Sequence, residues 1–267
     1  MIRPKAKARV SGAGTDIGPS RLTLLAAGCW LLLLTLLLHH SALDGYWRFD
    51  DGWLLDYASR FAPWEYWFDP GVTRGYSPNN LTPWNPFLFD INLALFGFSP
   101  AGFYGQHLAT LAAVAWASFL LLRLWLGSAF ALLGASAFLF GAPVLQVAQQ
   151  LMVGHYLLGL LFAISALYAF VRGVRARRWR WVAGGALCYV MASACKEVFV
   201  PLPGLLPFLG EGDLRTRLRY ALPFFAWSLA YLGWRYQVLG TLVGGYAGIP
   251  PDPTACLLYT SDAADDN

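Results

Sequence analysis

The sequence predicts an all-α, polytopic integral membrane protein with about six to seven transmembrane helices and a long helical first extracytoplasmic loop. Hydrophobic residues make up 57% of the chain and charged residues only 13%, well below the roughly 25% charge of soluble domains. Apolar runs near the bilayer-crossing length of about 20 residues recur along the chain. The basic residues gather between these runs, where they act as topology signals, so the net charge of +4 indicates no nucleic-acid partner.

The first predicted span, 22–38, is an almost unbroken leucine run that follows a basic tail, residues 1–21. Positive charge beside a first span favours a cytoplasmic N-terminus. The run is long for a signal peptide, and no small-residue cleavage site follows it. We therefore expect an uncleaved anchor.

The predicted first outer loop, residues 39–104, is too long for an unstructured connection. Aromatic residues follow one another at a spacing of four, at Trp53, Tyr57 and Phe61. This stripe predicts an amphipathic helix lying in the membrane interface. Asp56 and Arg60 would form an i,i+4 pair beside the stripe. The apolar segment 87–98 predicts a second helix that packs against the bundle.

Six more apolar segments complete the predicted membrane domain, 22–255. They are 105–126, 128–144, 150–171, 181–194, 198–209 and 220–239. The segment 198–209 is short and contains three prolines, which predicts a re-entrant or broken helix.

The arginines support this order of spans. With the N-terminus inside, the loops after the fourth and sixth spans are cytoplasmic, and they hold the arginines between 172 and 180 and between 215 and 219. The first loop, Lys196, Glu197 and Arg235 then share the outer face. This common side is the main structural prediction from the sequence.

The last residues, 256–267, differ in character from the rest of the chain. Cys256 to Asp265 reads as the translation of a transposon-based sequencing adapter. We therefore expect 256–267 to be an artefact that is excluded from fold reasoning, and the natural protein to continue past about residue 255.

Paired acids at Asp50 and Asp51 are the first candidate site. One aspartate could cap the helix that follows, by accepting hydrogen bonds from its free N–H groups. A cap needs one carboxylate, however, and two adjacent ones could act as a general base and its positioning partner. The sequence leaves both interpretations open.

Three charged residues near the outer ends of later spans form the second candidate site. Lys196 could bind a lipid phosphate while Glu197 balances its charge, or both could snorkel to water. Arg235 could be a second phosphate ligand, because its planar fork suits that anion, or another snorkelling side chain. His155 and Asp90 are interpreted as structural. No metal-ligand spacing, phosphate loop or nucleophile motif is found, so no cofactor is expected and no metal is indicated, although the sequence leaves a divalent metal open.

Together these features resemble the C-type (GT-C) membrane glycosyltransferases, the superfamily of protein O-mannosyltransferases and lipid A aminoarabinose transferases. The resemblance lies in a cytoplasmic N-terminus, one span, an outer loop opening on "FDDGW", and then "LFGFSPAGFYGQHLATL" and "SACKEVFVPLPGLLPFL". It covers roughly residues 22–209.

The resemblance implies a polyprenyl-phosphate sugar donor and a glycan, lipid or protein acceptor at the periplasmic or outer face of the cytoplasmic membrane. It implies that Asp50 or Asp51 is the base and that Lys196 and Glu197 lie near the lipid phosphate. A transporter is the first alternative, although transporters often show internal repeats and none is evident here. A non-catalytic membrane assembly protein is the second, and it would tolerate loss of the acids.

Overall fold

A computed structural model of the chain describes residues 20–209 and 211–242. Within these ranges the chain is helical and contains no β-strand, so the predicted all-α class is confirmed. The basic tail up to residue 19, the adapter-like residues 256–267 and the end of the predicted membrane domain lie outside the described residues.

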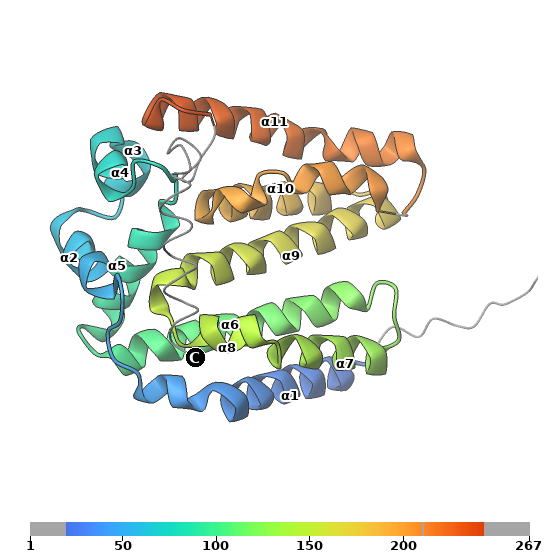
Figure 1. The fold of residues 1–267 in the computed structure, drawn as a ribbon. Coiled ribbons are helices and arrows are strands. Elements are labelled where there is room, and N and C mark those ends of the chain that lie inside the picture. The colour runs from blue at the N-terminus through green and yellow to red at the C-terminus, as the bar shows by residue number, and fades with distance from the viewer. Residues whose placement is uncertain (1–19, 210, 243–267) are drawn as a thin grey trace, which may run out of the picture.

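Long helices lie side by side and form most of the bundle (Figure 1). They are α1 (Arg21–His39), α6 (Pro100–Leu122), α7 (Ser128–Leu139), α9 (Gly154–Ala176), α10 (Trp179–Cys195) and α11 (Leu214–Leu239). Shorter helices cover one end of this bundle. They are α2 (Asp51–Arg60), α3 (Glu65–Phe68), α4 (Pro70–Tyr76) and α5 (Trp84–Phe96). The remaining elements are α8 (Ala142–Ala148) and the 3₁₀ helices η1 (His40–Asp44), η2 (Leu151–Val153), η3 (Glu197–Phe199) and η4 (Leu202–Phe208).

Three helical stretches of the described chain are long and apolar enough to cross a membrane. They are Arg21–Asp44, Pro100–Leu122 and Leu151–Ala176. Helices α7 and α8 pass the same test only as a pair, and they are bent by 61° at the break between them. The described residues thus contain three candidate spans, or four if the bent pair counts as one. Helices α10 and α11 lie alongside them (Figure 1) but do not meet this test.

Apolar side chains also cover the outside of the bundle. Leu22, Leu37 and Phe130 lie on apolar helices, and each is exposed by 64% or more. A helix that is apolar on every side is typical of a membrane span, because lipid replaces water around it. The exposed leucines and aromatics therefore fit a protein that sits in a bilayer.

The two helices predicted in the first outer loop are present. Helix α2 buries Leu54, Tyr57 and Ala58, and the predicted pair forms between Arg60 Nη2 and Asp56 Oδ2 at 2.6 Å. Helix α5 packs against α2, α6 and α9. Together α2 and α5 give the end of the bundle a helical cover.

The proline-rich segment after α10 is a broken helix, as its sequence predicts. It consists of η3 and η4 and runs from Lys196, near α4 and α5, to Glu211, whose carboxylate accepts a hydrogen bond from Trp125 at 2.8 Å. Since a 3₁₀ helix rises about 2.0 Å per residue, Glu197–Phe208 extends over roughly 24 Å, close to the roughly 26 Å of α10. The segment thus returns the chain to the opposite end of the bundle, where α11 begins.

Candidate functional site

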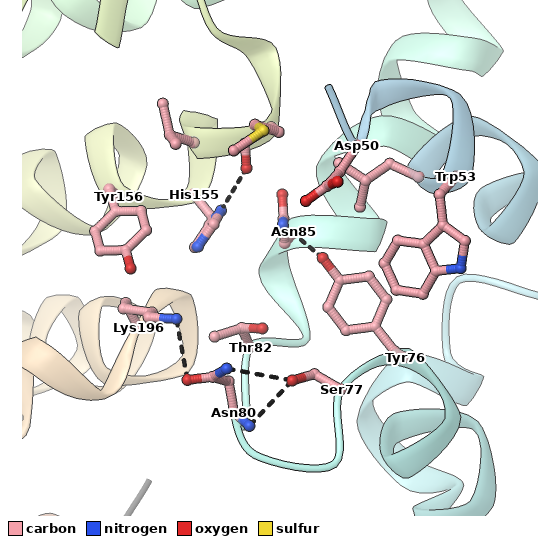
Figure 2. Close-up of a pocket in the computed structure, with 13 residues that line it drawn as sticks. Asp50, Trp53, Tyr76, Ser77, Asn80, Thr82, Asn85, His155, Tyr156 and Lys196 are labelled. Atoms are coloured by element: carbon pink, nitrogen blue, oxygen red, sulfur yellow. Dashed lines mark hydrogen bonds between the residues drawn. The ribbon is translucent and has the colours of Figure 1, made fainter. Parts of the chain in front are cut away.

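A pocket of about 290 Å³ opens where the short helices meet the bundle (Figure 2). Its polar lining comes from four segments of the chain: the start of α2, the stretch from the end of α4 to the start of α5, the start of α9 and the residue after α10. The polar and aromatic lining residues are Asp50, Trp53, Tyr76, Ser77, Asn80, Thr82, Asn85, His155, Tyr156 and Lys196.

Asp50 stands immediately before α2 and faces the pocket (Figure 2). The preceding residue, Phe49, has a φ of 51°, a left-handed conformation that is rare for a bulky residue. This sharp turn begins α2. Asp50 occupies the N-cap position, but its side chain makes no capping hydrogen bond. The interpretation of Asp50 as a capping residue is therefore wrong, and its carboxylate is left facing the pocket.

Asp51 has different surroundings, because its side chain is 1% exposed and does not line the pocket. Its Oδ2 accepts a hydrogen bond from the Arg48 N–H at 2.9 Å, and its Oδ1 has no hydrogen-bond partner among the described residues. Burial raises the pKa of this carboxyl, and the nearby backbone N–H groups of Arg48 and Met152 only partly oppose that shift. Of the two neighbouring acids, Asp50 is thus exposed and Asp51 is buried.

Lys196 supplies the positive charge of the pocket. It follows the last residue of α10 in an extended conformation, and its ammonium donates to Asn80 Oδ1 at 3.2 Å. The same ammonium lies 5.1 Å from the centroid of the Tyr156 ring, a distance at which a cation is attracted to the ring face. In the described part of the chain no carboxylate is within salt-bridge distance of Lys196.

Glu197 pairs with Arg235 and not with Lys196. The Arg235 guanidinium is ion-paired to Glu197 Oε1 and also donates to the Asn79 carbonyl at 2.8 Å. Glu197 Oε1 accepts in addition from the Leu81 N–H at 2.6 Å. The pair therefore holds the backbone of residues 79–81, which border Asn80 of the pocket. Arg235 itself does not line the pocket.

The five sequence-predicted site residues gather at this one end of the bundle, but they do not form one cluster. Asp50 and Lys196 share the pocket, while Glu197 and Arg235 hold the segment beside it and Asp51 lies buried behind Asp50.

His155, which the sequence predicts to be structural, is a residue of the pocket. Its Nδ1 is bonded to the Met152 carbonyl at 3.1 Å, and its ring lines the pocket opposite Lys196 (Figure 2). Asn85, whose amide donates to the Tyr76 hydroxyl at 2.5 Å, was not singled out at all. The only signal for His155 was its place at the start of a span, and Asn85 had none.

Asp90 has the structural role expected of it. The Tyr66 hydroxyl donates to its Oδ2 at 3.4 Å, and burial raises the pKa of the Asp90 carboxyl. Among the residues described, no three His, Cys, Asp or Glu side chains gather closely enough to hold a metal ion.

No protein-family model, curated protein or solved structure matches the chain. The fold defines a helical protein with several apolar stretches able to span a membrane. Its pocket combines a carboxylate that can accept a proton, an ammonium that can bind an anion, and hydroxyl and amide groups that can bind a polyhydroxylated molecule.

Proposed function

We propose that the protein is a GT-C-type membrane glycosyltransferase. It would move a sugar from a polyprenyl-phosphate donor to an acceptor on the extracytoplasmic face of the cytoplasmic membrane. The observation that supports this most is that Asp50 and Lys196, 146 positions apart in the sequence, line one polar pocket at one end of an apolar helical bundle.

Lys196 is the proposed phosphate ligand. Among the described residues its ammonium has only the neutral Asn80 oxygen and the Tyr156 ring as close partners, so its charge is available to an anion. As the bond between the sugar and the phosphate breaks, negative charge grows on the phosphate oxygen, and a fixed ammonium stabilises that charge. Arg235 is less suited to this role, since Glu197 already neutralises it.

Asp50 is the proposed general base. The acceptor oxygen attacks the anomeric carbon, the bond from that carbon to the phosphate oxygen breaks with its electron pair going to the phosphate, and Asp50 takes the acceptor proton. Attack from the side opposite the phosphate inverts the anomeric configuration. Buried Asp51, which holds the Arg48 N–H, supports the turn that carries Asp50.

The proposed orientation places the pocket outside and the opposite end of the bundle inside. Arg172, Arg175 and Arg177 lie at the end of α9 that is farther from His155, where cytoplasmic charge is expected. In this arrangement α1, α6, the bent pair α7 and α8, α9, α10, the segment of η3 and η4, and α11 make seven crossings.

The test is a sugar-transfer assay on membranes that contain the protein. Membranes are assayed with undecaprenyl-phosphate-linked glucose, mannose and aminoarabinose. Asp50→Asn should lower kcat by roughly 10²- to 10⁴-fold, the usual contribution of a general base. Asp56→Asn is the matched control, since Asp56 is an exposed acid of α2, the helix that Asp50 precedes, and it pairs with Arg60. This variant should keep its activity. Undiminished turnover by Asp50→Asn would refute the proposed base.

A further inference from the structure

His155 is the one imidazole among the residues that line the pocket, and the proposed mechanism leaves it unused. It is the second residue of α9, its side chain is almost fully buried, and it lines the same pocket as Asp50 and Lys196 (Figure 2). A buried histidine at a polar pocket raises the question of what its second nitrogen contacts.

The Met152 bond fixes the tautomer of the ring. A backbone carbonyl can only accept, so Nδ1 must carry the proton that it donates to the Met152 oxygen. In the neutral ring Nε2 then carries a lone pair. The positive charge of Lys196 in the same pocket disfavours protonation of the imidazole. In Figure 2 this second nitrogen points away from the Met152 bond and into the space beside Lys196.

The other two buried histidines have the opposite arrangement. His107 uses Nε2 to bond the Val147 carbonyl at 2.8 Å, and His39 uses Nε2 to bond the Leu139 carbonyl at 3.2 Å. Neither residue lines the pocket. Only His155, among the buried histidines of the described residues, turns Nε2 toward a cavity.

We propose that His155 is a substrate-contacting residue whose Nε2 accepts a hydrogen bond from a hydroxyl group of the sugar. The inference rests on the proposed function and deepens it. The pocket supplies donors from Lys196 and from the amides of Asn80 and Asn85, and a sugar hydroxyl that donates needs an acceptor such as Nε2. His155 would thus help to select sugars with a donating hydroxyl at that position.

Two substitutions separate this role from a structural one. His155→Asn keeps an amide near the position of Nδ1, and so keeps the Met152 bond, but removes the acceptor at Nε2. His155→Gln places an amide oxygen near the position of Nε2 and gives up the Met152 bond. If Nε2 contacts the sugar, kcat/KM should fall roughly tenfold or more in His155→Asn, about the value of one hydrogen bond, and clearly less in His155→Gln. A His155→Asn variant that is at least as active as His155→Gln would overturn the inference.

His107→Gln is the matched control, because it preserves a donor to the Val147 carbonyl and lies outside the pocket. It should leave kcat/KM unchanged within about twofold, well under the effect of one hydrogen bond. A deoxy sugar donor, in which the hydroxyl that contacts His155 is replaced by hydrogen, gives a second test. The kcat/KM of the wild type should fall with the deoxy donor as it falls in His155→Asn with the normal donor. His155→Asn should use the normal and the deoxy donor equally well.

Chemical labelling tests the contact without requiring turnover. Diethyl pyrocarbonate acylates an unprotonated imidazole nitrogen that it can reach. It should therefore modify His155, which lines the pocket, and spare His107, which is buried outside it. The same undecaprenyl-phosphate sugars should protect His155. If a sugar donor protects His155 from acylation but none of the three donors supports sugar transfer, the proposed glycosyltransferase function is refuted and the proposed His155 contact is retained. If the wild type transfers sugar from a donor that does not slow the acylation of His155, the proposed contact is refuted and the glycosyltransferase function is retained.

Discussion

Arg235 and Glu197 form an ion pair between α11 and the residue that opens η3, with their side chains 1% and 18% exposed. Through this pair the Asn79 carbonyl and the Leu81 N–H are both held. Of the two cations that the sequence suggested as phosphate ligands, Arg235 thus helps to fix the wall of the pocket, and Lys196 is the one that faces the pocket.

Removing one member of this pair should destabilise the protein strongly. Arg235→Met leaves the Glu197 carboxylate without its cation, and the loss of one partner of a buried pair costs about 3–5 kcal/mol. The partial exposure of Glu197 places the expected value near the lower end of that range. Thermal unfolding in detergent micelles, followed by tryptophan fluorescence, measures it.

The double variant Arg235→Met/Glu197→Gln should recover part of this loss, because no unpaired charge remains. Arg60→Met is the surface control, since the Arg60 and Asp56 side chains are 65% and 49% exposed, and it should cost less than about 1 kcal/mol. Equal losses in Arg235→Met and Arg60→Met would contradict a buried, structural pair.

Asp51 should make stability depend on pH. Its folded-state pKa lies above the ordinary 3.8 because burial disfavours the charged form, so between 3.8 and the raised pKa the folded chain binds more protons than the unfolded one. Stability should therefore fall as pH rises through this window and level off above it. Chemical unfolding across a pH series measures the slope, and Asp51→Asn should reduce it. An identical slope in that variant would show that another group causes it.

Gly159 of α9 should not tolerate a side chain. An added Cβ would clash with the Phe199 ring and lie 2.9 Å from Cys195 Cβ, so Gly159→Ala should cost about 1–3 kcal/mol through overpacking. Gly184 of α10 has no such neighbour within 4 Å, and Gly184→Ala should stabilise the helix by up to about 1 kcal/mol. Unfolding midpoints of the two variants should move in opposite directions. Similar shifts would mean that η3 does not pack against α9 as described.

The proposed orientation can be tested with cysteines at exposed positions of the two ends. Arg60→Cys in α2 and Arg178→Cys before α10 are introduced after the native cysteines are replaced by alanine. A membrane-impermeant maleimide should label Arg60→Cys in intact spheroplasts and Arg178→Cys only after permeabilisation. Labelling of both from the same side would contradict an outer pocket and an inner arginine cluster.

Local features of the fold could be predicted well from the sequence. The four-residue aromatic spacing located α2, and the Asp56–Arg60 pair formed as its spacing required. The prolines of 198–209 correctly indicated a broken helix, because each removes an N–H that an α-helix would use. The number of crossings stays a prediction, since α10 and α11 are less apolar or shorter than the helices that meet the membrane test.

The site could be predicted only in outline. Placing Lys196 and Asp50 on one face required only the alternation of spans, and the structure brings both to one pocket. The partner of Glu197 could not be found in this way, because Arg235 is 38 positions away and the adjacent Lys196 was the obvious candidate. Likewise Asn80 meets Lys196 across 116 positions. Such contacts depend on how helices rotate about their axes, which composition and spacing do not reveal.

The 3₁₀ segment of η3 and η4 has few backbone hydrogen-bond donors for its length. Three of its residues, Pro201, Pro203 and Pro207, have no amide hydrogen. In the proposed arrangement this segment crosses the bilayer, where each backbone N–H without an acceptor would be costly. The three prolines would lower the number of N–H groups that need an acceptor there. Replacing these prolines with alanine would add a backbone N–H at each position, and each new N–H would need a hydrogen-bond acceptor.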